Sequence, residues 1–301
     1  MFNKNPNQKY IDLSYFKPKR CPFCTSKVLV KWGFVYNHKT KKRRYLCKGC
    51  KNTFVVKDGF YRMRKSREVI TECLNLYVNG LSTRKAKEHI EQFSEVKLSH
   101  MSVLRWLRKY SVMLKLFTDK LSVNLGGTYH TDEIFIKCKG QDNFFWNMVD
   151  KDTRFLVATH YSAERNFENA KILFIKAKER AIKPIEIYSD GLSAYRNAYY
   201  KVFWNRYSEK RVTYNQIIKR KDRRNNIIER VEGTLRERVK VMRGFGSQES
   251  AESIMNLICV WYNFIRKHQG IGMTPSQRAG IDLHLQKNKW LGLIYLSSIG
   301  C

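Results

Sequence analysis

Acidic residues are scarce in this chain relative to basic ones. Its 301 residues contain 26 Asp and Glu against 58 Lys and Arg, which gives a formal net charge of +32. Residues 1–123 hold 28 of the basic and 8 of the acidic side chains, so the excess is concentrated towards the N-terminus. Solubility alone rarely needs such an excess, and no basic amphipathic helix stands apart as a membrane-surface element. The composition therefore indicates a polyanionic partner.

Long apolar runs are also missing. The N-terminal stretch MFNKNPNQKYIDLSYF lacks the apolar core of a signal peptide, and the apolar C-terminal run WLGLIYLSSIG is about half the length of a spanning helix. We therefore expect a cytoplasmic protein, associated with the nucleoid if its partner is DNA. In a reducing compartment the eight cysteines are expected as metal ligands or buried thiols, because disulfides are rare there.

Four of the cysteines form two Cys-x-x-Cys pairs, CPFC and CKGC. The 22 residues between the pairs contain a strand-like run and a basic hairpin tip. Two such pairs can supply four thiolates to one tetrahedral zinc ion, with no ligand position left open for water. We predict a zinc ribbon over residues 1–58. The predicted ligands of one structural Zn²⁺ are Cys21, Cys24, Cys47 and Cys50. Cys73 and Cys259 lie on apolar helical faces and are expected in hydrophobic cores.

Residues 59–120 are predicted to form a helix-turn-helix domain. The first helix ends at Asn79 and Gly80, which is typical of a C-cap, and the third is expected to begin at Ser99 or Ser102. An ordinary three-helix bundle with a solvated basic face has nearly the same pattern, but the charge and the cysteine pairs favour DNA binding. The side chains expected to contact DNA are Ser102, Arg105, Arg108 and Lys109. The face of the third helix expected to be buried comprises Val103, Leu104, Trp106, Leu107 and Val112.

Residues 125–282 have the pattern of an α/β domain. Three strand-like runs, TYHTDEIFIKC, NFFWNMVD and RFLVATHYS, are followed by a helix, the short strand IEIYSD and another helix. This order predicts a mixed sheet with three antiparallel strands and then alternating helix and strand. A basic stretch at 219–224, a plausible loop for binding the DNA backbone, precedes two more helices, the last expected to span 247–270. Residues 283–301 are predicted to be a C-terminal tail.

Three acidic residues of this domain stand in different structural settings. Asp132 lies in the first strand, Asp190 ends the short strand, and Glu229 opens the helix-like run NNIIERVEGTLRERVKVMRGF. Carboxylates brought together from separate elements can hold two divalent cations about 4 Å apart. Asp132 and Glu133 point to opposite faces of their strand, so we expect one to face the metals and the other to face solvent or a partner. Glu232, three residues after Glu229 on nearly the same face, is the rival candidate.

Other residues near these carboxylates have expected roles too. Lys240 and Arg243, one to two turns beyond the carboxylates of the helix, are expected to hold phosphates. His130 falls on the same strand face as Asp132, where a supporting or packing role is commoner than contact with a metal. Asn225 or Asn226 is expected to cap the helix that carries Glu229.

With these motifs the sequence resembles a DDE transposase of a prokaryotic insertion sequence. The matching stretches are TDEIFIKCKG, FWNMVDKDTRFLVATHYS, YSDGLSAY, NNIIERVEGTLRERVKVMRGF and WYNFIRKHQGIGMTPSQRAGI. The cysteine pairs followed by a helix-turn-helix also resemble the end-binding region of many such proteins. The resemblance covers about residues 20 to 282. It implies a catalytic domain of ribonuclease-H-like fold, and it assigns the catalytic and metal-binding carboxylates to Asp132, Asp190 and Glu229.

The resemblance also implies a reaction. Two Mg²⁺ ions, with Mn²⁺ as a substitute, are expected in each active site, one activating water or the freed 3′ hydroxyl and the other stabilising the leaving 3′ oxygen. The protein would bind the terminal inverted repeats of its element and join the cut ends to target DNA, as a dimer or a larger homo-oligomer. Two other functions compete with this one. A regulator derived from a transposase would bind DNA without cutting it, and a metal-dependent nuclease or resolvase would cut without joining.

Overall fold

The computed structural model describes residues 18–37, 40–181, 184–218 and 225–299. The chain divides into two compact units, Met1–Arg64 and Lys65–Cys301. The predicted basic loop at 219–224 lies outside the described residues, as do part of the predicted hairpin tip and Cys301. Within the described part of the chain, no helix is both long enough and apolar enough to cross a membrane.

The first unit contains a small antiparallel sheet in the order β1-β2-β3. Its strands are β1 (Leu29–Asn37), β2 (Thr40–Cys47) and β3 (Thr53–Val55). The pairing of β1 with β2 shifts register between Lys31 and Phe34, and Gly33 lies in this shift with φ of 68°, a left-handed conformation that glycine adopts without strain. Leu29 at the start of β1 pairs with Cys47 at the end of β2. The two cysteine pairs therefore lie at the same end of the sheet.

The second unit begins with three helices, each with a serine at its N-cap. They are α1 (Arg67–Val78), α2 (Thr83–Ser94) and α3 (His100–Thr118). Ser66, Ser82 and Ser99 each accept a hydrogen bond from a backbone N–H of the first turn. Of the two caps considered for α3, Ser99 is the one used. The predicted buried face of α3 is wrong at Val112, which is 57% exposed, because the helix turns this side chain away from the bundle.

A five-stranded sheet follows, in the order β6-β5-β4-β7-β8. Its strands are β4 (Thr128–Cys138), β5 (Gln141–Asp150), β6 (Leu156–Ser162), β7 (Glu186–Ser189) and β8 (Thr213–Gln216). The first three are antiparallel, and β7 and β8 are parallel to β4. This is the predicted mixed sheet, with the strand order and directions of the ribonuclease-H-like fold. The short strand β8 was not predicted.

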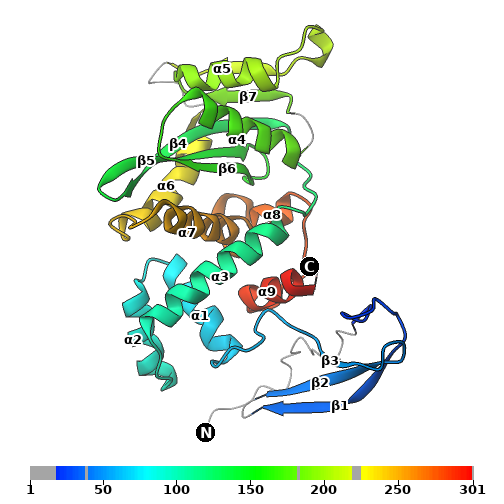
Figure 1. Ribbon diagram of the computed structural model, residues 1–301. Coiled ribbons are helices and arrows are strands. Elements are labelled where there is room, and N and C mark those ends of the chain that lie inside the picture. Colours follow the sequence, from blue (N-terminus) through cyan, green and yellow to red (C-terminus); the bar gives the residue numbers. More distant parts are fainter. Residues whose placement is uncertain (1–17, 38–39, 182–183, 219–224, 300–301) are drawn as a thin grey trace. The chain divides into compact units, whose positions relative to one another are not determined.

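Helices cover both faces of the sheet (Figure 1). On one face α4 (Phe167–Arg180) and α5 (Ser193–Val202) pack together over a core that includes Trp146, Phe174 and Tyr195. On the other face α6 (Asn226–Lys240) packs against β4. Residue alternation in β4 explains the division, because Tyr129, Thr131 and Glu133 point to one face and His130 and Asp132 to the other. Asn225 occupies the N-cap position of α6, but its side chain makes no capping hydrogen bond.

The predicted long final helix is shorter in the structure. The α-helix α7 (Gln248–Val260) continues only as a π-helical turn, η4 (Trp261–Ile265), and the chain then leaves the helix axis. Buried Asn263 explains the change, because its side-chain amide accepts a hydrogen bond from the N–H of Leu156 at 3.0 Å and donates one to the carbonyl of Leu156 at 3.1 Å. The short helices η2 (Ser208–Lys210), η5 (Gln269–Ile271) and α8 (Pro275–Arg278) fill connections.

The C-terminal segment is helical where the sequence had indicated a tail. Helix α9 (Lys289–Ile299) packs against α1 and α3, and Trp290 donates a hydrogen bond to the Asn75 side chain at 3.3 Å. Helix α3 also packs along α7, the long helix beneath the sheet (Figure 1). The helical segment and the α/β segment are therefore one compact unit, joined through α3 and α9.

Candidate active site and DNA-binding surfaces

The two predicted aspartates lie side by side at one end of the sheet. Strands β4 and β7 are parallel neighbours, and Thr131 of β4 pairs with Ser189 of β7. The next residue in each strand is an aspartate, Asp132 and Asp190. Because neighbouring strands lie about 4.8 Å apart, the register brings the two carboxylates to the same edge. This is the carboxyl end of the parallel strands, where open α/β sheets bind ligands.

Burial and negative neighbours raise the pKa of Asp132 to about 7. Burial contributes most, followed by the negative charge of Glu133 and, more weakly, that of Asp190. The backbone N–H of Glu133, which donates to Asp132 Oδ1 at 2.9 Å, and the Arg236 guanidinium act in the opposite direction. Burial and the neighbouring carboxylates thus favour the protonated form of Asp132.

The two candidate glutamates of α6 differ in environment. Glu229 is exposed near the start of the helix. Glu232 is 1% exposed, and burial together with the negative charge of Asp132 raises its pKa to about 9. Arg236 Nη2 lies 2.7 Å from Glu232 Oε2. Glu232 Oε1 is buried and has no hydrogen-bond partner among the described residues. The structure thus brings Glu232 close to Asp132 and leaves Glu229 at the surface of the site.

Of the two alternatives expected for the residue opposite Asp132, solvent or a partner, Glu133 does not face solvent. It is 3% exposed and points to the α4–α5 face. There Tyr195 of α5 donates a hydrogen bond to Glu133 Oε2 at 2.6 Å, and Arg165 forms an ion pair with Oε1. The same guanidinium lies 3.9 Å from Asp190 Oδ2. Arg165 and Tyr195 are site residues that the sequence reasoning missed, since their partner Glu133 is 32 and 62 positions away.

The acidic residues fit a divalent cation in their chemistry. Hard cations such as Mg²⁺ take carboxylate oxygens, and the unpartnered Glu232 Oε1 together with the two raised pKa values shows charge that a cation would offset. Their donor atoms are spread out, however. Among the described residues, the four ribbon cysteines are the only group of three or more His, Cys, Asp or Glu ligand atoms that all lie within 4.8 Å.

His130 is a packing residue in this structure. Its ring is buried and stacks on Tyr188, with ring centroids 4.9 Å apart. Burial is the main cause that lowers the pKa of His130 to about 4, so the ring is neutral at physiological pH. A neutral, enclosed imidazole agrees with the supporting role that was expected to be commoner than metal contact.

The predicted zinc ligands gather in the first unit. The Sγ atoms of Cys21 and Cys50 are 3.6 Å apart and those of Cys24 and Cys47 are 3.5 Å apart. Four sulfurs at about 2.3 Å from a tetrahedral zinc are about 3.8 Å from one another, so the set fits the ion. The backbone N–H of Cys50 is the main cause that lowers the pKa of the Cys47 thiol to about 6, whereas hydrogen bonds with the neighbouring thiols of Cys50 and Cys47 raise the pKa of Cys24 to about 12. Cys73 and Cys259 are buried, as predicted.

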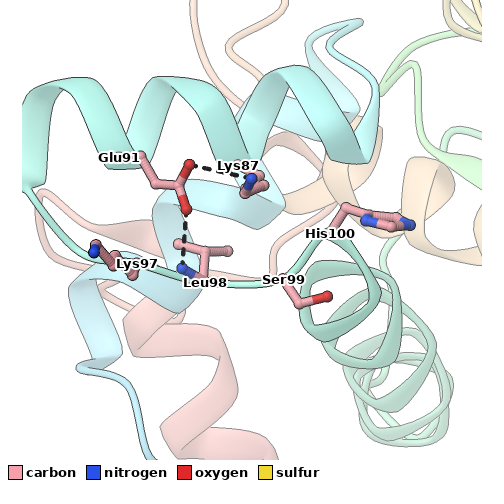
Figure 2. A pocket seen from close by; sticks show the side chains of 6 residues that line it. All are labelled: Lys87, Glu91, Lys97, Leu98, Ser99 and His100. Carbon is pink, nitrogen blue, oxygen red and sulfur yellow. Dashed lines mark hydrogen bonds and ion pairs between the residues drawn. The ribbon is translucent and has the colours of Figure 1, made fainter.

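The predicted DNA-contacting side chains of α3 lie on its outer face. Arg105, Arg108 and Lys109 are exposed and Ser102 is half-buried. Next to the start of α3 is a hollow of about 490 Å³ between α2 and α3. Figure 2 shows Glu91 in this hollow, with its carboxylate paired with Lys87 and accepting the N–H of Leu98. The Glu91 carboxylate therefore offsets part of the positive charge that Lys87 and Lys97 bring to this hollow. On α6 and just beyond it, Lys240 and Arg243 are both exposed.

Comparisons with known proteins give distant relatives in archaea. An uncharacterized protein of Methanocaldococcus jannaschii is 32% identical over 127 residues, which are 42% of this chain and 56% of that protein. An uncharacterized 48.3 kDa protein of the insertion element ISM1 of Methanobrevibacter smithii is 23% identical over 195 residues, which are 59% of this chain and 46% of that protein. The chain thus spans about half the length of these curated relatives.

Solved structures with some likeness are viral integrases. The HTLV-2 integrase catalytic core domain in complex with magnesium has a TM-score of 0.38 at 12% identity, covering 53% of this chain and 99% of that one. A chain of the simian T-cell lymphotropic virus intasome has a TM-score of 0.42 at 10% identity, covering 70% and 75%. These scores are too low to support a conclusion about this chain.

One family model matches the α/β segment directly. Residues 126–269 match the model of a DDE domain. The matched region begins just before β4 and ends after η4, so it contains Asp132, Asp190 and the whole of α6. Residues 126–269 are therefore similar to a DDE domain, the type of domain that DDE transposases contain.

Proposed function

We propose that this protein is a transposase that binds the ends of a mobile DNA element and catalyses metal-dependent strand cleavage and strand transfer. The observation that carries the proposal is the pair Asp132, within β4, and Asp190, directly after the parallel neighbour β7, inside the matched DDE domain and beside α6 with its two candidate glutamates. Phosphoryl transfer depends mainly on positioning and charge neutralisation, and this edge of the sheet supplies fixed carboxylates for both.

The proposed catalytic carboxylates are Asp132, Asp190 and Glu229, and they would also hold two Mg²⁺ or Mn²⁺ ions. When bound, such ions supply Lewis-acid activation of the attacking oxygen and stabilise the leaving 3′ oxygen. Asp132 and Asp190 are fixed by two strands of one sheet, so the chain itself sets their separation. The exposure of Glu229 suits a group that meets DNA and metal at the mouth of the site, whereas Glu232 lies deeper and pairs with Arg236.

The other parts of the chain have proposed roles in DNA binding. The ribbon would hold one structural Zn²⁺, and α3 would read the element's ends in the major groove through Ser102, Arg105, Arg108 and Lys109. Lys240 and Arg243 would contact backbone phosphates. The net charge of +32 supports a double-stranded DNA partner. Because two ends must be paired, we propose at least a homodimer, acting on the nucleoid in the cytoplasm.

A strand-transfer assay tests the proposal. Purified protein would be incubated with a labelled fragment that carries the element's end, supercoiled plasmid and Mg²⁺, beside an Asp190→Asn variant. Joined products that require the metal and vanish in the variant are the expected result, since the substitution removes one ligand charge with almost no change in shape. The ISM1 name of one relative also supports an insertion-element origin.

Two other outcomes point to the rival functions. Metal-dependent cleavage without joined products would indicate a nuclease or resolvase. Specific binding of the element's end without cleavage, in both Mg²⁺ and Mn²⁺, would indicate a DNA-binding regulator and contradict the enzyme proposal. Asp190→Asn should bind the fragment as well as the parent protein does in the absence of metal, which keeps loss of catalysis separate from loss of binding.

A further inference from the structure

Arg165 stands between the buried core of the DDE domain and the carboxylate edge. It directly precedes Asn166, the N-cap residue of α4. Its guanidinium is ion-paired with Glu133 and lies 3.9 Å from Asp190 Oδ2, while 35% of its side chain remains exposed. The same nitrogen, Nη2, makes both contacts, so the guanidinium lies between the buried Glu133 and the half-exposed Asp190.

The buried face of the domain fixes this position. Glu133 is almost completely enclosed, and a buried carboxylate is stable only when it is paired and hydrogen-bonded. The Tyr195 hydroxyl donates a hydrogen bond to Glu133 Oε2 at 2.6 Å, and Arg165 forms an ion pair with Oε1. Tyr195 is itself fully buried and packs edge-on against Trp146 at 5.5 Å between ring centroids. Arg165 is thus oriented by rigid core residues, although its own segment is a surface connection.

A cation in this place has a use beyond neutralising Glu133. DNA approaching Asp132 and Asp190 brings phosphates into a site that already carries several carboxylates. A guanidinium with free N–H groups beside Asp190 can receive a phosphate oxygen through directed, charge-assisted hydrogen bonds. The first turn of α4, immediately after Arg165, adds the positive end of a helix dipole.

We propose that Arg165 contacts a phosphate of the bound DNA strand next to Asp190, and that Glu133 and Tyr195 are positioning residues that hold it there. This assignment rests on the proposed function, because it presupposes that DNA enters the carboxylate site. It gives the pair Glu133–Tyr195 a purpose that the metal-binding carboxylates do not explain. The competing explanation is that Arg165 only balances the buried charge of Glu133.

A double substitution separates these explanations. Arg165→Met alone leaves Glu133 buried without its cation, so a lowered melting temperature is expected with either explanation. Glu133→Gln combined with Arg165→Met removes both charges, keeps the volume and preserves the hydrogen bond from Tyr195. This double variant should melt close to the parent protein. Arg165→Lys keeps a cation without the planar fork, and Arg278→Met removes an exposed arginine of α8 as the matched control.

The measurement is binding of a short fluorescein-labelled DNA duplex by anisotropy, without metal, over a series of salt concentrations. The slope of log affinity against log salt counts the phosphates that the protein neutralises. We expect the folded double variant to bind several-fold more weakly, with a slope smaller by about one. Arg165→Lys should keep the parent slope while binding more weakly, and Arg278→Met should match the parent protein.

The outcomes distinguish the assignment from the proposed function. A folded double variant with the affinity and slope of the parent protein would overturn the assignment of Arg165 and leave the transposase proposal standing. Failure of the parent protein itself to bind duplex DNA would overturn both. A slope reduced by about one in the double variant, but not in Arg278→Met, supports the phosphate contact even if no strand transfer is ever detected.

Discussion

Glu229 and Glu232 lie three residues apart on α6 and meet different surroundings. Glu229 is exposed, whereas Glu232 is enclosed beside Asp132 with Arg236 on one oxygen. A ligand shared between metal and DNA has to be reachable from outside, which favours Glu229 as the third catalytic carboxylate. Glu232 would then act on Asp132 only electrostatically, from its buried position beside that carboxylate.

Single substitutions should separate the two roles. Glu229→Gln is expected to abolish metal-dependent cleavage, by about 10³-fold or more, with little change in melting temperature, because an exposed side chain contributes little to folding. Glu232→Gln should reduce cleavage less and change the pH dependence of stability. Cleavage rates of both variants measure the catalytic effect of each substitution, and thermal melts measure its effect on stability. The reverse ranking, with Glu232→Gln inactive and Glu229→Gln active, would move the third ligand to Glu232.

The two raised pKa values predict how stability of the metal-free protein changes with pH. Asp132 and Glu232 have folded-state pKa values of about 7 and about 9, above the ordinary values of 3.8 and 4.5. The folded state therefore binds these protons more tightly than the unfolded state does. These two groups should therefore make stability fall as pH rises from about 4 through 7 and towards 9.

Urea unfolding between pH 5 and 8, in a chelator, measures this dependence. Glu232→Gln should flatten the curve, and so should added Mg²⁺. Glu237→Gln, which removes an exposed carboxylate of the same helix, should leave the curve as steep as in the parent protein. A parent curve that rises with pH over this range would contradict the assignment of trapped negative charge.

At the scale of elements, α9 and α3 together join the helical segment to the rest of its unit. Leu293 is fully buried, and its helix contacts α1, α3 and η4. Leu293→Ala should lower the free energy of unfolding by about 2–5 kcal/mol, since it leaves a cavity between these elements. Leu116→Ala on α3, where the side chain is 58% exposed, is the matched control and should cost under about 0.5 kcal/mol. Urea unfolding of the two variants measures the difference, and equal losses would contradict the packing.

Local signals in the sequence predicted most elements because their causes are local. Serine caps, apolar spacing and strand alternation depend on neighbours within a few positions, and Ser99 and β4 are placed as expected. The features that were missed depend on distant partners. Asn263 ends α7 through a residue 107 positions away, and Glu133 is enclosed by a tyrosine 62 positions away. The apolar run of α9 showed no periodicity of its own, so its packing surface was not predictable.

The same contrast holds for the candidate site. Asp132 and Asp190 could be predicted to lie close together because the sequence places one in a strand and the other at a strand end. The parallel pairing of β4 with β7 then brings the two residues side by side. The choice between Glu229 and Glu232 depends on how far α6 is rotated against β4, which no local pattern specifies. The predicted domain boundaries also remain predictions, although the break between the two compact units at residue 64 lies near the end of the predicted ribbon.

At the scale of the whole molecule, the two compact units should respond separately to loss of zinc. The first unit has a small sheet and few buried residues, so its folding should depend on the ion. The parent protein should contain one zinc per chain by elemental analysis. Cys47→Ser or a strong chelator should remove it and change the fluorescence of Trp32, while the main melting transition of the second unit stays in place.

Cys73→Ser provides the opposite control. Cys73 is buried in α1 of the second unit, so its substitution should lower the main melting transition and leave the zinc content at one per chain. A loss of the main transition on chelation alone would show that the second unit needs the ribbon in order to fold, contrary to the division into two units.

Helix α3 has a geometric consequence for the proposed reaction. It has 19 residues and is therefore about 28 Å long, its exposed basic residues Arg105, Arg108 and Lys109 lie in its first half, and it packs against α7. Helix α3 and the carboxylate site belong to the same compact unit. The distance between the proposed DNA-reading residues of α3 and the proposed cleavage site is therefore fixed. The number of base pairs between the recognised sequence and the cut bond would then be constant, and a duplex with half a helical turn inserted between them would be bound but left uncut.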